Sequence, residues 1–122
     1  MNLFDSSALL CLLKGERGAD LVERALDDAG GVCSAANWSE TAQKILASGR
    51  NWQRARMLLI GYGMVVEPVL AADAEGAALL WHSRSGLSLA DRLCLATAQR
   101  LDAVVWTADT SWGSSDTVRQ IR

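Results

Sequence analysis

Short apolar runs alternate with longer amphipathic segments along the whole chain. The short runs predict strands at residues 2–5, 32–34, 64–66 and 103–106, because each combines β-branched, aromatic or other apolar residues with flanking turn residues. A further short strand is predicted at residues 117–121. This alternation is typical of an α/β fold with a parallel sheet.

The segments between these strands predict six helices. Ser6 or Ser7 is expected to cap the first of them. Asn37, with Glu40 three positions later, resembles a capping box at the start of the third. The predicted helices end or begin at glycine or polar residues and cover residues 7–13, 19–29, 37–49, 51–62, 71–82 and 88–101.

Two of these helices have an apolar face that predicts how they pack. In residues 51–62 the face consists of Trp52, Ala55, Leu58 or Leu59, and Tyr62. In residues 71–82 it consists of Ala74, Ala77, Ala78 and Trp81, mostly small side chains that permit close packing.

Length and apolar content indicate one domain that spans residues 1–122. The chain has 122 residues, half of them apolar, and no linker, repeat or low-complexity segment. The apolar run at residues 8–13 is too short for a membrane span. It is also too short for a signal peptide, and no basic segment precedes it. We therefore expect a soluble, cytoplasmic protein with no membrane partner.

Charge and cysteine content exclude two broad classes of protein. The net charge of -2 excludes a protein that coats nucleic acid through a general positive charge. Any contact with nucleic acid must therefore be local, and the excess of Arg over Lys suits local phosphate contacts. Cys11, Cys33 and Cys94 lie far apart in apolar surroundings, so a disulfide framework or a cysteine metal site is not expected.

Four acidic residues are predicted to gather at one edge of the sheet. Asp5 ends the first strand and Asp109 follows the fourth, while Glu40 and Asp91 are expected in the first turns of helices. Ligands of open α/β sheets bind at the carboxyl ends of the strands. Two carboxylates about 4 Å apart repel by about 4 kcal/mol at an effective dielectric near 20, so a divalent cation is expected between them. An all-oxygen ligand set favours Mg²⁺, with Mn²⁺ as the alternative.

Each acid also has a simpler interpretation. Glu40 and Asp91 could stabilise helix N-termini, an effect of about 0.3–1 kcal/mol that implies no function. The chain would then be a non-catalytic protein-interaction domain whose acids only cap helices. Asp5 fits this interpretation less well, because Asp is disfavoured at the end of an apolar strand. Trp112, just past Asp109, either shapes the edge of the site or packs in the core.

Four segments resemble the motifs of a known family. The stretch Asp5-Ser6-Ser7-Ala8-Leu9-Leu10 resembles the opening motif of PIN-domain ribonucleases, specifically the toxins of VapC-type toxin–antitoxin pairs. Residues 34–40, residues 87–96, and residues 107–109 with Trp112 are similar to the second, third and fourth motifs, in the family's order. The resemblance implies a PIN-like three-layer α/β/α domain with a central, mostly parallel sheet of four to five strands.

The resemblance also implies an activity and a set of site residues. It implies a Mg²⁺-dependent endoribonuclease that cuts cellular RNA, such as tRNA or rRNA, until a cognate antitoxin blocks it. Ser6 and Thr107 are expected to orient the carboxylates through hydrogen bonds. The catalytic residues would be Asp5, Glu40, Asp91 and Asp109, with Asp5, Asp91 and Asp109 as the metal ligands and Glu40 positioning the attacking water.

Substrate and partner contacts follow from the same resemblance. Arg92, Arg84 and Arg100 are candidates to bind the RNA backbone, and a second basic group is formed by Arg50, Arg54 and Arg56, although solvated helix faces explain these residues equally well. The antitoxin is expected to lie in an apolar groove of the N-terminal helices, with a basic group entering the acidic pocket. A homodimer is also expected.

Overall fold

A parallel sheet forms the centre of the molecule. The computed structural model describes residues 1–83 and 85–122. The described residues form a five-stranded sheet in the order β3-β2-β1-β4-β5, and every strand pair is parallel. The strands are β1 (Asn2–Phe4), β2 (Gly31–Ser34), β3 (Met64–Glu67), β4 (Val104–Thr107) and β5 (Val118–Gln120). The predicted fold class is confirmed, including the short last strand.

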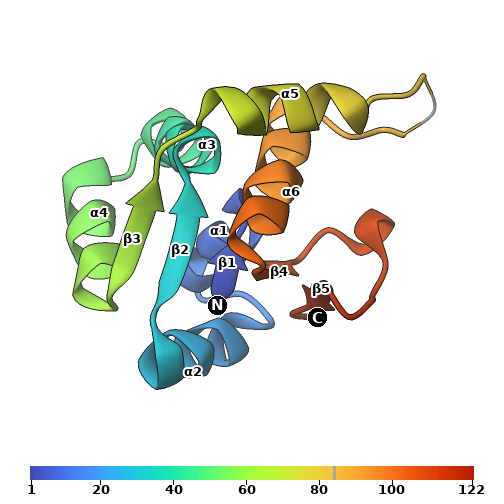
Figure 1. Ribbon diagram of the computed structural model, residues 1–122. Helices are drawn as coiled ribbons and strands as arrows, with labels where there is room; N and C mark the ends of the chain where they lie inside the picture. The colour runs from blue at the N-terminus through green and yellow to red at the C-terminus, as the bar shows by residue number, and fades with distance from the viewer. Residues whose placement is uncertain (84) are drawn as a thin grey trace.

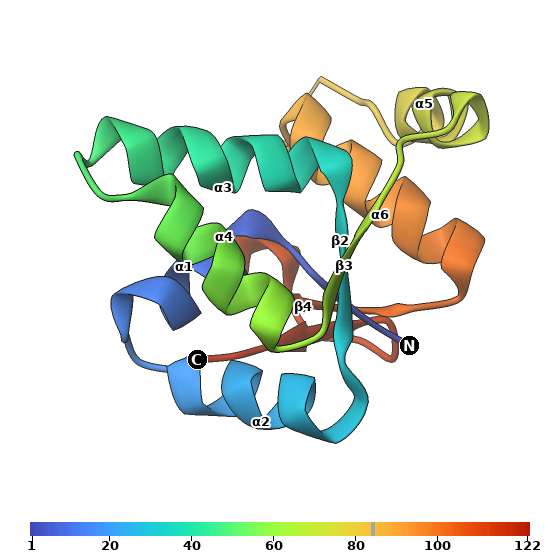
Figure 2. The same ribbon diagram turned by 90° about the vertical axis from the view of Figure 1, so that its left-hand side faces the viewer.

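Helices cover both faces of this sheet (Figures 1 and 2). Helices α1, α2 and α4 lie on one face, α6 lies on the other, and α5 packs against α6. Helix α3 crosses the carboxyl end of the sheet and contacts both α1 and α6. Their bounds are α1 (Ser6–Lys14), α2 (Ala19–Ala29), α3 (Ala35–Ala47), α4 (Trp52–Gly61), α5 (Ala71–Leu79) and α6 (Leu89–Leu101), followed by a 3₁₀ turn at Thr110–Trp112.

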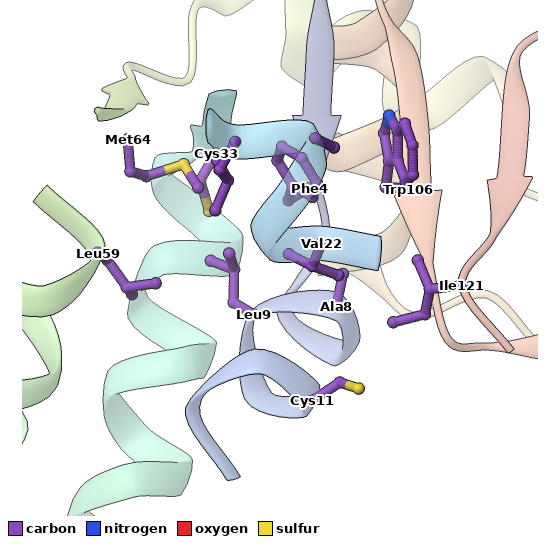
Figure 3. Close-up of a cluster of buried hydrophobic side chains, with 12 residues drawn as sticks. Phe4, Ala8, Leu9, Cys11, Val22, Cys33, Leu59, Met64, Trp106 and Ile121 are labelled. Atoms are coloured by element: carbon purple, nitrogen blue, oxygen red, sulfur yellow. The ribbon is translucent and has the colours of Figure 1, made fainter. Parts of the chain in front are cut away.

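Alternation along the strands separates two hydrophobic clusters. Phe4 points toward α1 and α2, whereas its neighbour Leu3 points toward α6. The larger cluster, drawn in Figure 3, joins Phe4 and Trp106 of the sheet to Leu9 of α1 and Leu59 of α4. The three-layer arrangement follows from this division. Among the described helices none is both long and apolar enough to cross a bilayer.

The start of α3 differs from the prediction. The helix begins at Ala35, and the hydroxyl of Ser34 caps it by accepting a hydrogen bond from the amide of Ala36 at 3.2 Å. Ser34 is also the last residue of β2, so strand passes into helix without a loop. The predicted capping box of Asn37 and Glu40 is therefore wrong, and Glu40 lies in the second turn.

The buried face of α5 also differs from the prediction. The helix ends at Leu79, and its buried residues are Asp73 and Ala77, while Ala74, Ala78 and Trp81 are exposed. Asp73 is drawn inward because Arg100 of α6 binds its carboxylate through two nitrogens, at 2.7 and 3.0 Å. In α4 the predicted face is confirmed, with Leu59 rather than Leu58 buried.

Candidate active site

Asp5 is a buried carboxylate at the centre of the carboxyl edge of the sheet. It follows β1 directly, and its side chain is only 3% exposed. One carboxylate oxygen caps α1 by accepting from the amide of Ala8 at 2.9 Å, and it also accepts from the hydroxyl of Ser7 at 2.7 Å. The cap is thus Asp5 itself, and neither Ser6 nor Ser7 takes that role.

Thr107 joins Asp5 to the strand beside it. Its hydroxyl donates to the second carboxylate oxygen of Asp5 at 2.5 Å and accepts from the amide of Asp109 at 3.0 Å. One side chain at the end of β4 therefore fixes both the first acid and the backbone of the last. Thr107 lies where an orienting residue was expected.

Ser7 is a functional residue that the sequence analysis did not assign. Its hydroxyl donates to Asp5, accepts from the amide of Ala108 at 2.9 Å, and lies 3.2 Å from the hydroxyl oxygen of Thr107. The only local signal for this role is its position two residues after Asp5. The contact with Ala108 joins residues that are 101 positions apart, so it depends on the pairing of β1 with β4.

The surroundings of Asp5 disfavour its charge. Burial raises the pKa of its carboxyl group, the hydrogen bonds from Thr107, Ser7 and Ala8 lower it in part, and the charge of Asp91 raises it further. The net effect is a raised pKa. No salt bridge within the described residues involves Asp5, Glu40, Asp91 or Asp109. Asp5 is thus a buried acid that feels the charge of Asp91, and no described Lys or Arg side chain forms a salt bridge with it.

Glu40 reaches the site from α3. Its carboxylate accepts a hydrogen bond from the hydroxyl of Ser6 and a longer one, at 3.5 Å, from the side-chain amide of Asn37. Ser6 therefore orients Glu40, while Ser7 orients Asp5. Asn37 is fully buried, and its side-chain oxygen has no hydrogen-bond partner in the described part of the chain.

Asp91 lies in the first turn of α6 and caps it. Its carboxylate accepts from the amide of Ser88 at 3.0 Å, and its own amide donates to the Ser88 hydroxyl at 3.1 Å, which forms a capping box and confirms that Asp91 lies in the first turn of its helix. Burial raises the pKa of the Cys94 thiol, and the charges of Asp5, Asp91 and Glu40 raise it further. These three acids therefore lie near enough to this thiol for their charges to act on it.

The carboxylate of Asp109 is bound by its own turn. Its carboxylate accepts from the amide of Ser111 at 3.0 Å and from the Ser111 hydroxyl at 2.6 Å, which caps the 3₁₀ turn. No hydrogen bond between described residues joins this carboxylate to Asp5, Glu40 or Asp91. Its backbone carbonyl accepts from the side-chain amide of Gln120 at 2.8 Å, so β5 holds the loop that carries Asp109.

The donor set fits a hard divalent cation in its chemistry. Carboxylates and hydroxyls are the oxygen ligands that Mg²⁺ and Mn²⁺ prefer. The pKa of Asp5 is raised chiefly by burial and to a smaller extent by the charge of Asp91, and a bound divalent ion would offset both effects. In residues 1–83 and 85–122, however, no three Asp, Glu, His or Cys side chains stand close enough to hold one ion in their present positions.

The structure places most of the candidate RNA contacts in intramolecular interactions. Arg92 donates to the carbonyl of Ala77 at 3.0 Å. Arg100 binds Asp73 and also Glu67, at 2.9 Å, so an RNA contact there would compete with two carboxylates. Arg84 lies outside the described residues. Arg50, Arg54 and Arg56 are near α4 or on it, and Arg50 and Arg54 line an apolar groove.

Solved structures with the same fold include a toxin–antitoxin complex and a toxin. A toxin–antitoxin complex from Klebsiella pneumoniae contains a chain with 25% identity and a TM-score of 0.79, with 100% of this chain and 98% of that chain covered. VapC20 from Mycobacterium tuberculosis, a toxin that cleaves the sarcin–ricin loop, has 17% identity and a TM-score of 0.73, covering 95% and 98%. A Pyrobaculum aerophilum protein has 16% identity and a TM-score of 0.69, covering 98% and 88%.

Sequence comparison agrees with this structural likeness. No curated protein matches the chain at the level of sequence. The family model described as PIN domain matches residues 3–115, a range that includes all four motifs and all four acids. The match confirms the resemblance that the motifs indicated, and the chain belongs to the PIN domain family.

Proposed function

We propose that this protein is a metal-dependent endoribonuclease and the toxin of a toxin–antitoxin pair, acting in the cytoplasm. The observation that carries the proposal is the buried carboxylate of Asp5, which has no salt bridge to a described residue and feels the charge of Asp91, at the edge of the sheet where α/β proteins bind ligands. Membership in the PIN domain family and the likeness to VapC20, a toxin that cleaves the sarcin–ricin loop, support it.

The chain's residues would share the work as follows. Asp5, Asp91 and Asp109 would hold the metal, Mg²⁺ or Mn²⁺, which supplies charge neutralisation at the scissile phosphate and lowers the pKa of a bound water. Glu40, oriented by Ser6, would position the attacking water. Thr107 and Ser7 keep the Asp5 carboxylate in one orientation. Attack in line with the leaving oxygen needs no covalent enzyme intermediate.

The substrate class and partners are part of the same proposal. A structured RNA, tRNA or rRNA, is the proposed substrate, and the likeness to VapC20, which cleaves the sarcin–ricin loop, supports this choice. The Klebsiella pneumoniae complex supports an antitoxin partner. We assign that partner to the groove of about 730 Å³ lined by Leu13 of α1, Ile45 of α3 and Leu58 of α4. The exposed apolar side chain of Leu79, the last residue of α5, is available for a homodimer.

Cleavage by matched variants tests the activity. Purified Asp5→Asn and Asp91→Asn proteins, incubated with cellular RNA and Mg²⁺, are expected to cut at least about 100-fold more slowly than wild type, which corresponds to about 2.7 kcal/mol of lost transition-state stabilisation. Asp28→Asn, an exposed acid on α2, is the control and should cut normally. A chelator should stop wild type. A folded Asp5→Asn protein that cuts at the wild-type rate would contradict the proposal.

The second candidate function is a non-catalytic interaction domain. Two observations favour it: Asp91 forms a capping box, and the carboxylate of Asp109 is bound by Ser111. In that case neither acid needs a metal to account for its position. Metal-dependent stability separates the two functions, because an interaction domain of this kind gains nothing from Mg²⁺.

A further inference from the structure

A second pocket adjoins the candidate active site. It has a volume of about 370 Å³ and lies where the segment that precedes α6 approaches the loop that follows β4. The residues that matter for its chemistry are His82, Ser85, Leu87, Leu95, Ser111 and Trp112.

Two of these residues connect the pocket to the acids. Ser111 lines the pocket and at the same time donates its hydroxyl to Asp109 at 2.6 Å. Leu87 lines it from the position just before Ser88, whose amide donates to Asp91 at 3.0 Å. The pocket therefore lies next to the residues that position two of the four acids.

The lining is mostly uncharged and partly aromatic. Leu87 and Leu95 provide aliphatic surface, Ser85 and Ser111 provide hydroxyl groups, and Trp112 provides an indole that also packs against the cluster around Leu3. Among the described lining residues only His82 can carry a charge, since none is Asp, Glu, Lys or Arg. A phosphate or a carboxylate would have this imidazole alone as a cationic partner there, so the chemistry favours a neutral, flat group with polar edges.

We propose that this pocket takes one unstacked base of the RNA substrate, from a nucleotide next to the scissile phosphate. The inference rests on the proposed endoribonuclease function and adds a base-recognition subsite to it. The volume is at the lower end of small-ligand sites, which suits a single base. Unpaired bases bind proteins by stacking on aromatic side chains and by hydrogen bonds along their edges, and Trp112 with the two serines offers both.

A double-mutant cycle between protein and RNA tests the subsite. A short RNA that wild type cleaves is prepared with an abasic nucleotide at each position flanking the cut, and kcat and KM are measured for wild type, Trp112→Leu and Trp81→Leu. Trp81 is 62% exposed and does not line the pocket, so its variant is the matched control. Base–aromatic stacking predicts a KM increase of about 5- to 100-fold in Trp112→Leu, with kcat little changed.

The abasic RNAs give the decisive comparison. At one flanking position, loss of the base should slow wild type and Trp81→Leu by a similar factor but cause little further loss in Trp112→Leu. Trp112→Phe keeps an aromatic face and should recover most of the sensitivity of wild type. Equal cleavage of all abasic RNAs by wild type overturns the subsite, whether or not Trp112→Leu folds, and so does an undiminished penalty in folded Trp112→Leu. In these cases cleavage itself persists, whereas a wild type that cuts no RNA overturns the proposed function and the subsite together.

Discussion

Asp5 has two roles at the scale of a single residue, and they affect stability in opposite directions. Its oxygen caps α1, which stabilises the helix, while its buried charge has a raised pKa because of desolvation and the neighbouring Asp91. A cap needs an oxygen acceptor but no charge. A site that binds a cation needs the charge. The side-chain amide of Asn would cap α1 equally well, so a carboxylate at this position favours a role in binding a cation.

We expect Asp5→Asn to lose cleavage yet keep or gain stability at neutral pH without metal. Because the pKa of Asp5 is raised in the fold, the folded state binds more protons than the unfolded state, so its stability falls as pH rises from the unfolded value near 3.8 through the raised pKa. Asn at position 5 has no carboxyl group to ionise, so this loss of stability at higher pH disappears, while its side-chain oxygen still caps α1. Thermal unfolding of both proteins between pH 4 and about 8 measures it. A clearly lower Tm for Asp5→Asn at neutral pH would contradict the expectation.

At the scale of the element, β5 determines where Asp109 stands. The side-chain amide of Gln120 donates to the carbonyls of Asp109 and Gly113, both at 2.8 Å, and so closes the loop between them. The amide of Ile121 donates to the carbonyl of Thr107 at 3.0 Å, which extends the pairing of β5 with β4. The least clearly predicted strand, which has only three residues, thus positions one of the four acids.

Gln120→Leu should lower the apparent affinity for Mg²⁺ more than it lowers the stability of the fold. Without the two donated hydrogen bonds, the loop that carries Asp109 loses its fixed position, and a supporting contact of this kind typically contributes 10- to 100-fold. We expect the Mg²⁺ concentration for half-maximal cleavage to rise by about 10-fold, with a small change in Tm. Gln43→Leu, at an exposed position of α3, is the control. An unchanged Mg²⁺ dependence would show that β5 does not position the site.

Helices α5 and α6 are held together by a buried acid and an arginine. Asp73 is 1% exposed, and the hydrogen bonds from Arg100 hold the pKa of its carboxyl group below the usual value. For a lowered pKa the stabilisation is present above the unfolded value near 3.8 and is lost as pH falls through the folded value. Arg100→Gln should therefore be less stable than wild type at pH 7.

Urea unfolding at several pH values measures this contribution. The difference in unfolding midpoint between Arg100→Gln and wild type is expected to shrink as pH falls from about 4 through the lowered pKa of Asp73, because the carboxyl group then becomes protonated in folded wild type as well. Arg24→Gln, whose ion pair with Asp20 is exposed, should show little difference at any pH. A constant difference for Arg100→Gln across this range would contradict the role assigned to the pair.

At the scale of the whole molecule, the net charge of -2 hides an uneven distribution. The charges of Asp5, Asp91 and Glu40 all act on Cys94, and none of these acids forms a salt bridge with a described residue, while Arg100 and Arg24 pair with other acids. Part of the negative charge thus lies unpaired at the candidate active site. This distribution would reconcile an acidic protein with the proposed RNA substrate, because the repulsion would be local and a bound divalent ion would reduce it.

Mg²⁺ should therefore raise the stability of the whole fold. Ligand that binds only the folded state stabilises it by RT ln(1 + [L]/Kd), which is about 1.4 kcal/mol at ten times Kd. Thermal unfolding with increasing Mg²⁺ should show a rising Tm in wild type and no rise in the Asp5→Asn, Asp91→Asn double variant. NaCl that adds the same amount of positive charge as the Mg²⁺ salt is the control for a general salt effect. No response in either protein would favour the interaction domain over the nuclease.

The sequence by itself determined the order of strands and helices, the parallel sheet and the position of Asp5, because these depend on local periodicity and on which residues end each apolar run. It also determined the cap of α6, since Ser88 and Asp91 interact within one turn. The predicted caps of α1 and α3 lie one to three positions after the observed caps. The reason is that strand passes directly into helix: Asp5 follows β1 and caps α1, and Ser34 ends β2 and caps α3. Only the tertiary structure decided which side chains meet across the sheet. Ser7 with Ala108, Ser6 with Glu40, and Gln120 with Asp109 are contacts between distant segments, fixed by strand pairing and helix packing that no local pattern encodes.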